Sequence, residues 1–390
     1  MIIVQKFGGT SVATIEHLQR VSHLIKNELD RGNKIVVVVS AMGKFTDVLV
    51  DYINNFRPLD STAAAEHDVV LSAGEQISAG LLALSLMSLG VKARSWLSWQ
   101  IPINTTPQHM KADILNIEKN KIIDTISRNE VPIIAGFQGV YDQRVTTIGR
   151  GGSDISAVEI AATINAERCD IYTDVEGIYT TDPNLVPRAQ KLSVITYDEM
   201  LEMAATGAQV LHSRSVENAM HNNIKLQVLS SFKDQPGTLL IKQEEEMRNK
   251  PVTAITCNND EACINIRSID EPQEIFAPLA DANISVNIIV QDINSNSITF
   301  TVSKSDLAQT IKLLDAFDLF IDDKISIVSL IGIGMLSNSG VASKMFKELS
   351  ANNIKTLAIT TSEIKISVVL HEEYRELAVR LLHSAYGLDS

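Results

Sequence analysis

Residues 2–11 read Ile-Ile-Val-Gln-Lys-Phe-Gly-Gly-Thr-Ser, and this stretch decides the fold. Its apolar, β-branched first half is typical of a buried strand, and two glycines end it just before a helical pattern over 12–30. Glycines here let backbone N–H groups approach a phosphate closely, and the helix that follows adds its positive end. Lys6 supplies a compact positive charge. The alternative is a plain strand-to-helix turn with a lysine that reaches solvent.

The same alternation of strand and helix patterns continues through the first two-thirds of the chain. It is typical of an α/β domain with a mostly parallel sheet and helices on both faces. Strands are predicted over 2–6, 34–40, 132–137, 169–174 and 226–231, and helices over 12–30, 64–89, 117–129, 153–165 and 197–222. The charged segment 242–250 lacks apolar periodicity and marks the end of this domain.

Beyond that segment, the order strand, helix, strand, strand, helix occurs twice. The local sequence repeats as Asp281-Ala-Asn-Ile284 and Ala351-Asn-Asn-Ile354. A separation of roughly seventy residues is the scale of a duplicated small domain rather than of a solenoid repeat. We therefore predict three domains, at residues 1–245, 246–324 and 325–390.

Composition argues against several classes of protein. The 390 residues carry a formal net charge of -13, which opposes nucleic-acid binding because a polyphosphate backbone requires a basic face. The first residues lack a signal-peptide pattern, and no apolar run reaches the roughly 20 residues of a membrane span, so we expect a cytoplasmic protein without a membrane partner. Cys169, Cys257 and Cys263 lack zinc or disulfide spacing and are expected to be reduced and buried.

A second glycine-rich turn, Gly149-Arg-Gly-Gly-Ser-Asp154, also opens a helical pattern. An ordinary helix N-cap explains Ser153 or Asp154 at this point. A cap does not explain Arg150, whose guanidinium between small residues can hold a carboxylate with two hydrogen bonds. The turn therefore predicts an anion site, with simple capping as the alternative.

Three other polar features extend the candidate site. Thr173-Asp174 ends a predicted strand, where ligands of open α/β sheets bind, and it precedes Tyr179-Thr-Thr-Asp-Pro183; an Asx-type turn is the alternative. Glu75 lies in an otherwise apolar helix, where an unpaired carboxylate is costly, so it meets either a substrate ammonium or a structural cation. Thr46 either donates to a substrate carboxylate or caps a helix. No histidine has the context of a hydrolase or an H-E-x-x-H site.

Together these motifs resemble those of the aspartate kinase family, in the same order and over essentially the whole chain. They are Lys6-Phe-Gly-Gly-Thr-Ser11, Val39-Ser-Ala-Met-Gly43, Ser72-Ala-Gly-Glu75, Gly136-Phe-Gln-Gly139, Gly149-Arg-Gly-Gly-Ser-Asp154, Thr173-Asp-Val175, Gly177-Ile-Tyr-Thr-Thr-Asp-Pro183 and Ser362-Glu-Ile364. The resemblance implies an amino-acid-kinase-like parallel sheet sandwiched by helices, followed by two ferredoxin-like ACT (βαββα) domains. It implies that ATP, with Mg²⁺, phosphorylates the side-chain carboxylate of L-aspartate to 4-phospho-L-aspartate, the first step of lysine, threonine and methionine (diaminopimelate) biosynthesis.

The resemblance also implies roles for individual residues. Lys6 and Asp154 are implied to be catalytic, Lys6 by neutralising the transferring phosphoryl group and Asp154 by organising that lysine. The residues implied to hold aspartate are Ser40, Thr46, Glu75, Arg150 and Ser153. Those implied to hold the nucleotide are Lys6, Phe7, Gly8, Gly9, Thr173, Asp174, Tyr179, Asp182, Asn184, Gln209 and Val210. The ligands of Mg²⁺ stay open.

Departures from the family pattern bear on ATP affinity and on regulation. Asn184 and Gln209 stand where many relatives carry arginine and lysine, and each charge-assisted contact is worth on the order of 1.5–3 kcal/mol. The ACT pattern implies feedback by lysine and/or threonine, although Gln273 stands where relatives commonly carry glycine. The residues implied to hold the effector are Asp270, Gln291, Asp292, Ser337 and Gly340. Paired ACT units also imply a homo-oligomer, with a dimer as the expectation.

Two other interpretations stay open. A relative that phosphorylates acetylglutamate or a nucleotide would share the first domain, but such relatives generally lack a duplicated C-terminal module. A non-catalytic amino-acid sensor would follow if the changes at Asn184 and Gln209 abolished ATP binding. The sequence favours the enzyme because Lys6, Arg150 and Asp154 are present together, and that interpretation requires Lys6 and Arg150 to face one pocket.

Overall fold

The computed structural model describes residues 1–56, 63–208, 210–242, 251–267, 271–292, 295–335 and 338–389. The chain divides into two compact units. The first comprises Met1–Ile178, Lys191–Met200 and Gln209–Lys242, and the second comprises Tyr179–Gln190, Leu201–Ala208 and Gln243–Ser390. The segment Tyr179–Gln190, which carries part of the predicted nucleotide motif, is thus grouped with the C-terminal residues.

An eight-stranded sheet forms the centre of the first unit, in the order β10-β12-β11-β9-β1-β2-β6-β3. Only the β11–β12 pair in this sheet is antiparallel. The five predicted strands are confirmed as its five adjacent members β11, β9, β1, β2 and β6, whose apolar runs reflect cover on both faces. The strands are β1 (Ile2–Phe7), β2 (Lys34–Val39), β3 (Ala93–Trp96), β6 (Val131–Ala135), β9 (Arg168–Thr173), β10 (Val194–Thr196), β11 (Leu226–Ser230) and β12 (Thr238–Ile241).

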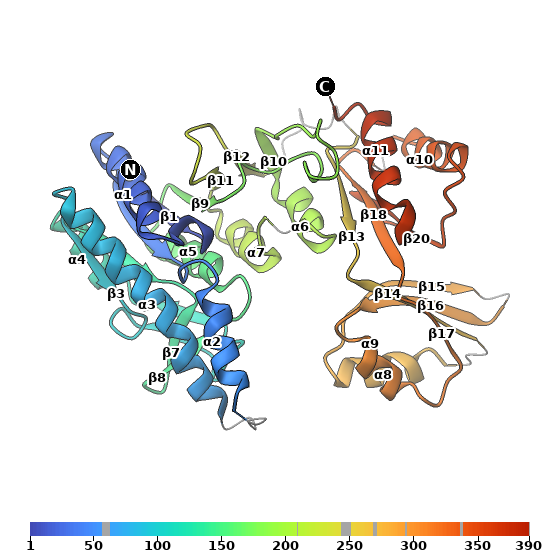
Figure 1. Ribbon diagram of the computed structural model, residues 1–390, viewed down its shortest axis with the longest axis horizontal. Coiled ribbons are helices and arrows are strands. Elements are labelled where there is room, and N and C mark those ends of the chain that lie inside the picture. Colours follow the sequence, from blue (N-terminus) through green and yellow to red (C-terminus); the bar gives the residue numbers. More distant parts are fainter. Residues whose placement is uncertain are drawn as a thin grey trace. The chain divides into compact units, whose positions relative to one another are not determined.

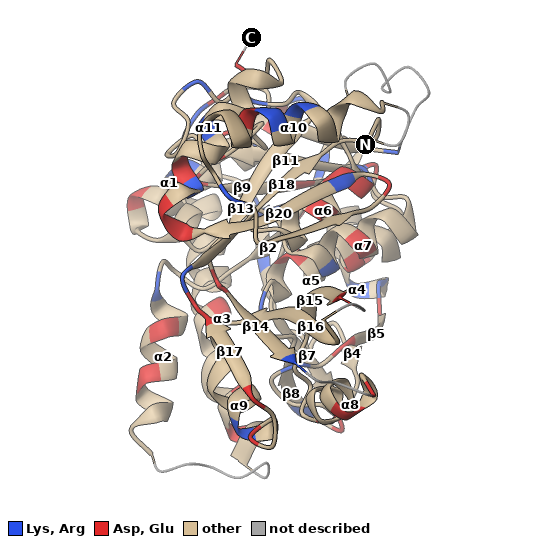
Figure 2. Cartoon of the chain, turned by 90° about the vertical axis from the view of Figure 1, so that its right-hand side faces the viewer, with Lys and Arg blue, Asp and Glu red and all other residues tan. Residues whose placement is uncertain are grey.

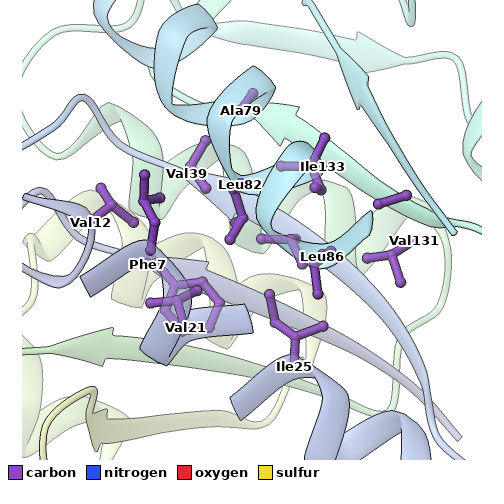
Figure 3. Packing of buried hydrophobic residues seen from close by; sticks show 14 of the residues in the cluster. Phe7, Val12, Val21, Ile25, Val39, Ala79, Leu82, Leu86, Val131 and Ile133 are labelled. Carbon is purple, nitrogen blue, oxygen red and sulfur yellow. The ribbon is translucent and has the colours of Figure 1, made fainter. Parts of the chain in front are cut away.

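Helices cover both faces of this sheet. The helices between residues 1 and 242 are η1 (Thr10–Val12), α1 (Ile15–Asp30), α2 (Phe45–Asn54), α3 (Ala64–Ser88), α4 (Asn120–Ser127), α5 (Gly152–Thr163), α6 (Tyr197–Ala205) and α7 (Ser213–Asn222), and not all of them touch the sheet. Figure 3 shows the core on one face, where Val21 of α1 and Leu82 of α3 approach Phe7 of β1. On the other face, α5 packs against β1, β2 and β9.

The prediction of one helix over 197–222 is wrong. Two helices, α6 and α7, occupy this stretch, and Gly207 between them has φ +115°, a conformation that L side chains rarely adopt. The glycine therefore permits a turn that the apolar pattern alone did not indicate.

A second, four-stranded sheet of the first unit was not predicted. It has the order β5-β4-β7-β8, and its strands are only three or four residues long. They are β4 (Ile103–Thr105), β5 (Ile114–Ile117), β7 (Gln138–Tyr141) and β8 (Arg144–Thr147). β8 leads directly to the turn that carries Arg150.

The long helix α3 packs against β3, β6 and β8. By length and composition alone it could cross a membrane, but half of that window is buried inside the protein. Asp68 and Glu75 are 0% and 3% exposed. A helix that buries two carboxylates among protein groups is a core helix rather than a membrane span.

The second unit contains two small sheets with helices, in agreement with the predicted ferredoxin-like ACT pattern. One has the order β15-β16-β14-β17, and α8 and α9 lie on one of its faces (Figure 1). The elements of this part are β14 (Glu261–Arg267), α8 (Gln273–Asp281), β15 (Val286–Asp292), β16 (Ser297–Ser303), α9 (Leu307–Leu313) and β17 (Leu319–Asp322).

The other small sheet has the order β13-β18-β20-β19. Its first strand, β13, lies before the first ACT repeat in sequence but pairs with β18, after that repeat. The elements are β13 (Ala254–Asn258), β18 (Ile325–Ile331), α10 (Gly340–Ala351), β19 (Ala358–Thr361), β20 (Lys365–His371), η4 (Glu372–Tyr374) and α11 (Arg375–Ala385). We therefore propose that residues 254–258 join 325–390 in the second ACT domain, rather than the domain expected at 246–324.

The composition also gives expectations for the surface charge and for the cysteines. Figure 2 shows acidic residues on α1 and α2, which fits a chain with 47 acidic and 34 basic residues. All three cysteines have free thiols, but only Cys169 is buried. The prediction of burial is wrong for Cys257 and Cys263, which lie half-buried because each sits near the end of a strand in a small two-layer domain.

Candidate active site

The centre of the candidate site is an ion pair between the end of β1 and the first turn of α5. Lys6 Nζ lies 2.5 Å from Asp154 Oδ1, and the two side chains are only 11% and 12% exposed. β1 lies between β9 and β2, so the pair sits at the middle of the sheet. Because so little water reaches it, this positive charge acts more strongly than it would on the open surface.

The glycine turn after Lys6 is held tightly against neighbouring backbone. Gly8 N–H donates to the carbonyl of Tyr172 at 3.1 Å, and Gly43 N–H donates to the carbonyl of Gly9 at 2.9 Å. A Cβ on Gly9 would lie 2.9 Å from the carbonyl oxygen of Gly43, so a side chain there is excluded. The Phe7 side chain is fully buried and stacks on Tyr172 at 4.7 Å, so it belongs to the core rather than to a ligand surface.

Glu75 has a buried carboxylate oxygen without a hydrogen-bond donor in the described part of the chain. Its Oε1 accepts a hydrogen bond from Ala41 N–H at 3.0 Å, while its buried Oε2 meets no donor among the described residues. Burial raises the pKa of Glu75 to about 7, although the nearby Lys6 charge opposes the shift. A buried acceptor without a donor is costly, so an incoming ammonium group would be bound favourably here.

Replacing Glu75 by glutamine is expected to stabilise the unliganded protein more at pH 8 than at pH 5. The folded-state pKa is raised, so stability from the protonated carboxyl is fully present below about 4.5 and is lost as the pH rises through about 7. Glutamine carries no charge, and the difference at pH 8 is on the order of 3 kcal/mol at about 1.4 kcal/mol per pKa unit. Urea unfolding of both proteins at the two pH values measures it. Equal stabilisation at pH 5 and pH 8 would contradict the buried-carboxylate account.

Ser40 and Thr46, predicted to hold aspartate, lie in the segment between β2 and α2. Ser40 N–H donates to the carbonyl of Phe7 at 3.0 Å, which ties this segment to the glycine turn. Thr46 lies in the first turn of α2, and both residues are half-buried. The segment thus runs beside Gly9 and Glu75, and the contact of Ser40 and Thr46 with aspartate stays a prediction.

The second glycine turn also requires its glycines. Gly149 and Gly151 have φ +83° and +73°, and a Cβ on Gly151 would lie 2.5 Å from the Cβ of His212. Arg150 between them is exposed. Ser153 is buried, and its Oγ lies 3.0 Å from the position of a Cβ on Gly136, so only glycine fits opposite it. The turn therefore presents one flexible cation at the start of α5.

His212 lies beside this turn and near both Arg150 and Asp154. Burial lowers the pKa of His212, and besides Arg214 the charges of Asp154 and Arg150 act on it. Asp154 thus contacts Lys6 on one side and lies near the histidine that Arg150 influences. The two glycine turns, some 140 residues apart in sequence, meet at the same end of α5.

Part of the predicted nucleotide site lies at the same edge of the sheet. Thr173 ends β9, which pairs in parallel with β1, and its hydroxyl donates to Asp174 Oδ1 at 3.0 Å. Asp174 is exposed. Because the carboxyl ends of parallel strands share one edge, Thr173 and Asp174 lie on the side of the sheet that carries the glycine turn.

The other predicted nucleotide residues are less informative. Asp182 Oδ1 accepts the N–H of Asn184 at 2.8 Å, which is the Asx-type turn considered as the alternative. Tyr179, Asp182 and Asn184 all belong to the segment grouped with the second unit. Val210 is half-buried, and Gln209 lies outside the described residues. Their contact with a nucleotide stays a prediction.

Sequence reasoning missed a serine pair at this edge. Ser231, just after β11, donates to Ser11 Oγ at 2.8 Å and to the carbonyl of Thr173 at 3.0 Å. Ser11 in turn donates to the carbonyl of Tyr172 at 3.4 Å. The only sequence signal was a pair of serines at the end of a predicted strand, 220 residues from Ser11.

No group of three His, Cys, Asp or Glu side chains that could hold a metal occurs among the described residues. The acidic groups of the site are the exposed carboxylate of Asp174, the paired carboxylate of Asp154 and the buried carboxylate of Glu75. This donor set fits Mg²⁺ that takes most of its ligands from phosphate oxygens and water, as Mg²⁺ commonly does.

Three of the five predicted effector residues, Gln291, Asp292 and Gly340, lie among the described residues. Gln273 is the first residue of α8 and Gly340 the first of α10. A Cβ on Gly340 would meet nothing within 4 Å, so the backbone there is open. Gln291 and Asp292 end β15 and are exposed, and their contact with an effector stays a prediction. Asp270 and Ser337 lie outside the described residues.

Comparison with known proteins identifies the family of the chain. The model of the amino acid kinase family matches residues 1–230, and an ACT domain model matches residues 328–386. An aspartate kinase of Pseudomonas fluorescens is 45% identical, with 100% of this chain and 98% of that protein covered. An aspartokinase of Geobacillus stearothermophilus is 42% identical, with 99% and 97% covered.

Solved structures give the same result. Aspartokinase III of E. coli in complex with aspartate and ADP (R-state) has a TM-score of 0.81 at 26% identity, with 99% of each chain covered. The same enzyme in complex with lysine and aspartate (T-state) has a TM-score of 0.79 at 26% identity, covering 98% of this chain and 99% of that one. The chain belongs to the aspartate kinase family and is an ATP-dependent kinase.

Proposed function

We propose that the protein transfers the γ-phosphoryl group of ATP to the side-chain carboxylate of L-aspartate, giving 4-phospho-L-aspartate and ADP. The observation that carries the proposal is the Lys6–Asp154 pair at the meeting point of two glycine turns. The complex of E. coli aspartokinase III with aspartate and ADP supports both ligands. The product opens lysine, threonine and methionine biosynthesis, and ATP as donor suits a cytoplasmic enzyme.

The reaction requires alignment and charge neutralisation more than proton transfer. A carboxylate oxygen of aspartate attacks the γ-phosphorus, and the bond from that phosphorus to the bridging oxygen of ADP breaks. The acceptor is already ionised at neutral pH, so no general base is needed. Lys6 neutralises charge that develops on the phosphoryl oxygens, and Asp154 holds the amine in place. Mg²⁺, bound to phosphate oxygens, would supply further neutralisation.

Recognition of aspartate is divided between two ends of the site. The free Oε2 of Glu75 accepts from the α-ammonium, and the Arg150 guanidinium binds a carboxylate. An N-acetylated acceptor offers no ammonium to Glu75, so this residue favours aspartate over acetylglutamate. Ser153, Ser40 and Thr46 supply hydroxyl groups near the acceptor.

A hydroxamate assay with purified protein, ATP, Mg²⁺ and hydroxylamine tests the proposal. Aspartate should give an aspartyl hydroxamate, because hydroxylamine traps the acyl phosphate. Equal turnover of acetylglutamate would overturn the substrate assignment. No turnover of any acceptor would favour the amino-acid sensor.

Feedback by lysine, threonine or both is the regulatory part of the proposal. The lysine complex of E. coli aspartokinase III supports it, as do the two ACT repeats with their open helix starts. We expect millimolar lysine or threonine to lower activity at subsaturating aspartate. Replacing Gly340 by valine should weaken this inhibition, while the initial rate without effector stays within about twofold because Gly340 is not among the residues proposed for the chemistry. Activity indifferent to both amino acids would remove the regulatory assignment.

Association through the ACT units is also proposed. Strands β15 and β19 are the outer strands of their sheets, and each carries an exposed isoleucine, Ile289 or Ile359. An unpaired strand edge with apolar side chains favours pairing with a second chain. Sedimentation velocity should show a dimer, and a monomer at micromolar concentration would contradict this.

A further inference from the structure

The buried carboxylate of Asp68 has no part in the proposed chemistry, yet it is the best-connected acid in the first unit. It lies on α3 and is 0% exposed. Its Oδ2 lies 2.6 Å from His109 Nδ1, and its Oδ1 accepts from Thr147 Oγ at 2.6 Å and from Met110 N–H at 3.1 Å. A single side chain thus joins α3, the segment between β4 and β5, and the end of β8.

These contacts fix the backbone on which the second glycine turn rests. Met110 has φ +67°, unusual for a non-glycine residue, and Asp68 holds its N–H. The carbonyl oxygen of Met110 would lie 2.9 Å from a Cβ on Gly149. Ala112 N–H also donates to the carbonyl of Thr147 at 2.9 Å. Two residues after Thr147 the chain enters the turn that presents Arg150.

Asp68 also has a fixed relation to Glu75, because both lie on α3. Seven residues correspond to two helical turns, so the two carboxylates share one face at a rise of about 10 Å. Glu75 faces the proposed ammonium site, and Asp68 supports the turn of the proposed carboxylate-binding arginine. One rigid helix therefore sets the separation of both recognition points.

We propose that Asp68 is a positioning residue for acceptor binding. Through His109, Met110 and Thr147 it holds the turn of Arg150 at a set distance from Glu75. This inference rests on the proposed function, since it requires Arg150 and Glu75 to hold the acceptor. Without Asp68 the site loses its geometry for aspartate, while the nucleotide side, built on β1 and β9, is unaffected.

The test is the variant Asp68→Asn, which keeps the shape of the side chain and removes its charge. The KM for aspartate should rise at least about tenfold, since a shift of about 1 Å in a positioning group can cost up to ~10²-fold. The KM for ATP should stay within about twofold. Calorimetric titration of the protein with aspartate should show a matching loss of affinity.

A double-variant cycle separates positioning from a general loss of stability. In an Arg150→Ala background, Asp68→Asn should not lower kcat/KM for aspartate further, because the arginine through which it acts is gone. A matched control is Glu28→Gln on α1, another buried carboxylate, which accepts from Arg31 and Asn33. This control should leave the KM for aspartate within about twofold.

Other variants keep the test decisive if Asp68→Asn does not fold. His109→Leu and Thr147→Val each remove one hydrogen-bond partner of Asp68 and should raise the KM for aspartate in the same direction, by several-fold each. An unchanged KM in all three variants, an equal rise in the KM for ATP, or a multiplicative effect in the Arg150→Ala background would overturn the inference. A wild-type protein that neither binds nor phosphorylates aspartate would instead overturn the proposed function, and the positioning role with it.

Discussion

Replacing Lys6 by methionine should lower kcat by roughly 10²–10³-fold or more, the range found when one group that stabilises transition-state charge is removed. Methionine retains most of the length of the side chain but carries no charge. The KM for aspartate should change much less, because Lys6 acts on the phosphoryl group rather than on the acceptor. Steady-state kinetics of the hydroxamate reaction, with each substrate varied in turn, measures this.

The ion pair complicates the variant, because Asp154 would lose its partner. Removing one member of a largely buried pair leaves an uncompensated charge, which by itself destabilises the fold. The double variant Lys6→Met/Asp154→Asn removes both charges and should recover much of the thermal stability without recovering activity. That combination would separate catalysis from folding.

Two further variants sharpen the test of Lys6. Lys6→Arg retains a positive charge beside Asp154 but replaces a compact ammonium with a planar guanidinium, so it should retain stability and lose most turnover. Lys34→Met, at the exposed start of β2, removes a lysine from the opposite end of the sheet and should leave kcat within about twofold. A Lys6→Met enzyme with near-normal kcat would exclude Lys6 from the transition state.

The fold of the first unit was largely predictable because its central strands are buried on both faces. Runs such as 35–39 are apolar throughout, and this pattern can be recognised without knowing which strands pair with it. The small sheet was not predictable in the same way. Its strands of three or four residues include polar positions such as Asn104 and Gln138, whose partners come from distant segments.

The same difference between local patterns and distant contacts applies to the candidate site. Glycine-rich turns can be recognised from the local sequence, so the turns of Gly8–Gly9 and Gly149–Gly152 were predicted. The contacts that hold them are tertiary: Asp68 and His109 are 41 residues apart, and Ser11 and Ser231 are 220 apart. Neither pair has a sequence pattern of its own. The exchange of β13 into the second ACT sheet was missed for the same reason, since strand pairing is not encoded in a single strand's pattern.

Replacing Arg150 by alanine should raise the KM for aspartate by about 10- to 100-fold, since charge-assisted hydrogen bonds are each worth on the order of 1.5–3 kcal/mol. The side chain is exposed on a glycine-rich turn, so its loss leaves no buried charge unpaired and should not destabilise the protein. The KM for ATP should stay close to the wild-type value. Calorimetry with aspartate alone should show the same loss of affinity.

Arg150→Lys and Arg144→Ala are the control variants for Arg150→Ala. Arg150→Lys retains the charge but cannot form two parallel hydrogen bonds, so its KM should lie between those of wild type and alanine. Arg144→Ala removes an arginine from β8 whose ion pair with Glu66 is largely solvent-exposed; such pairs are worth about 0–1 kcal/mol, and its KM should not change. If Arg150→Ala instead raised the KM for ATP alone, the guanidinium would serve the nucleotide. The carboxylate of aspartate would then need another partner, and the division of the site into two ends would be wrong.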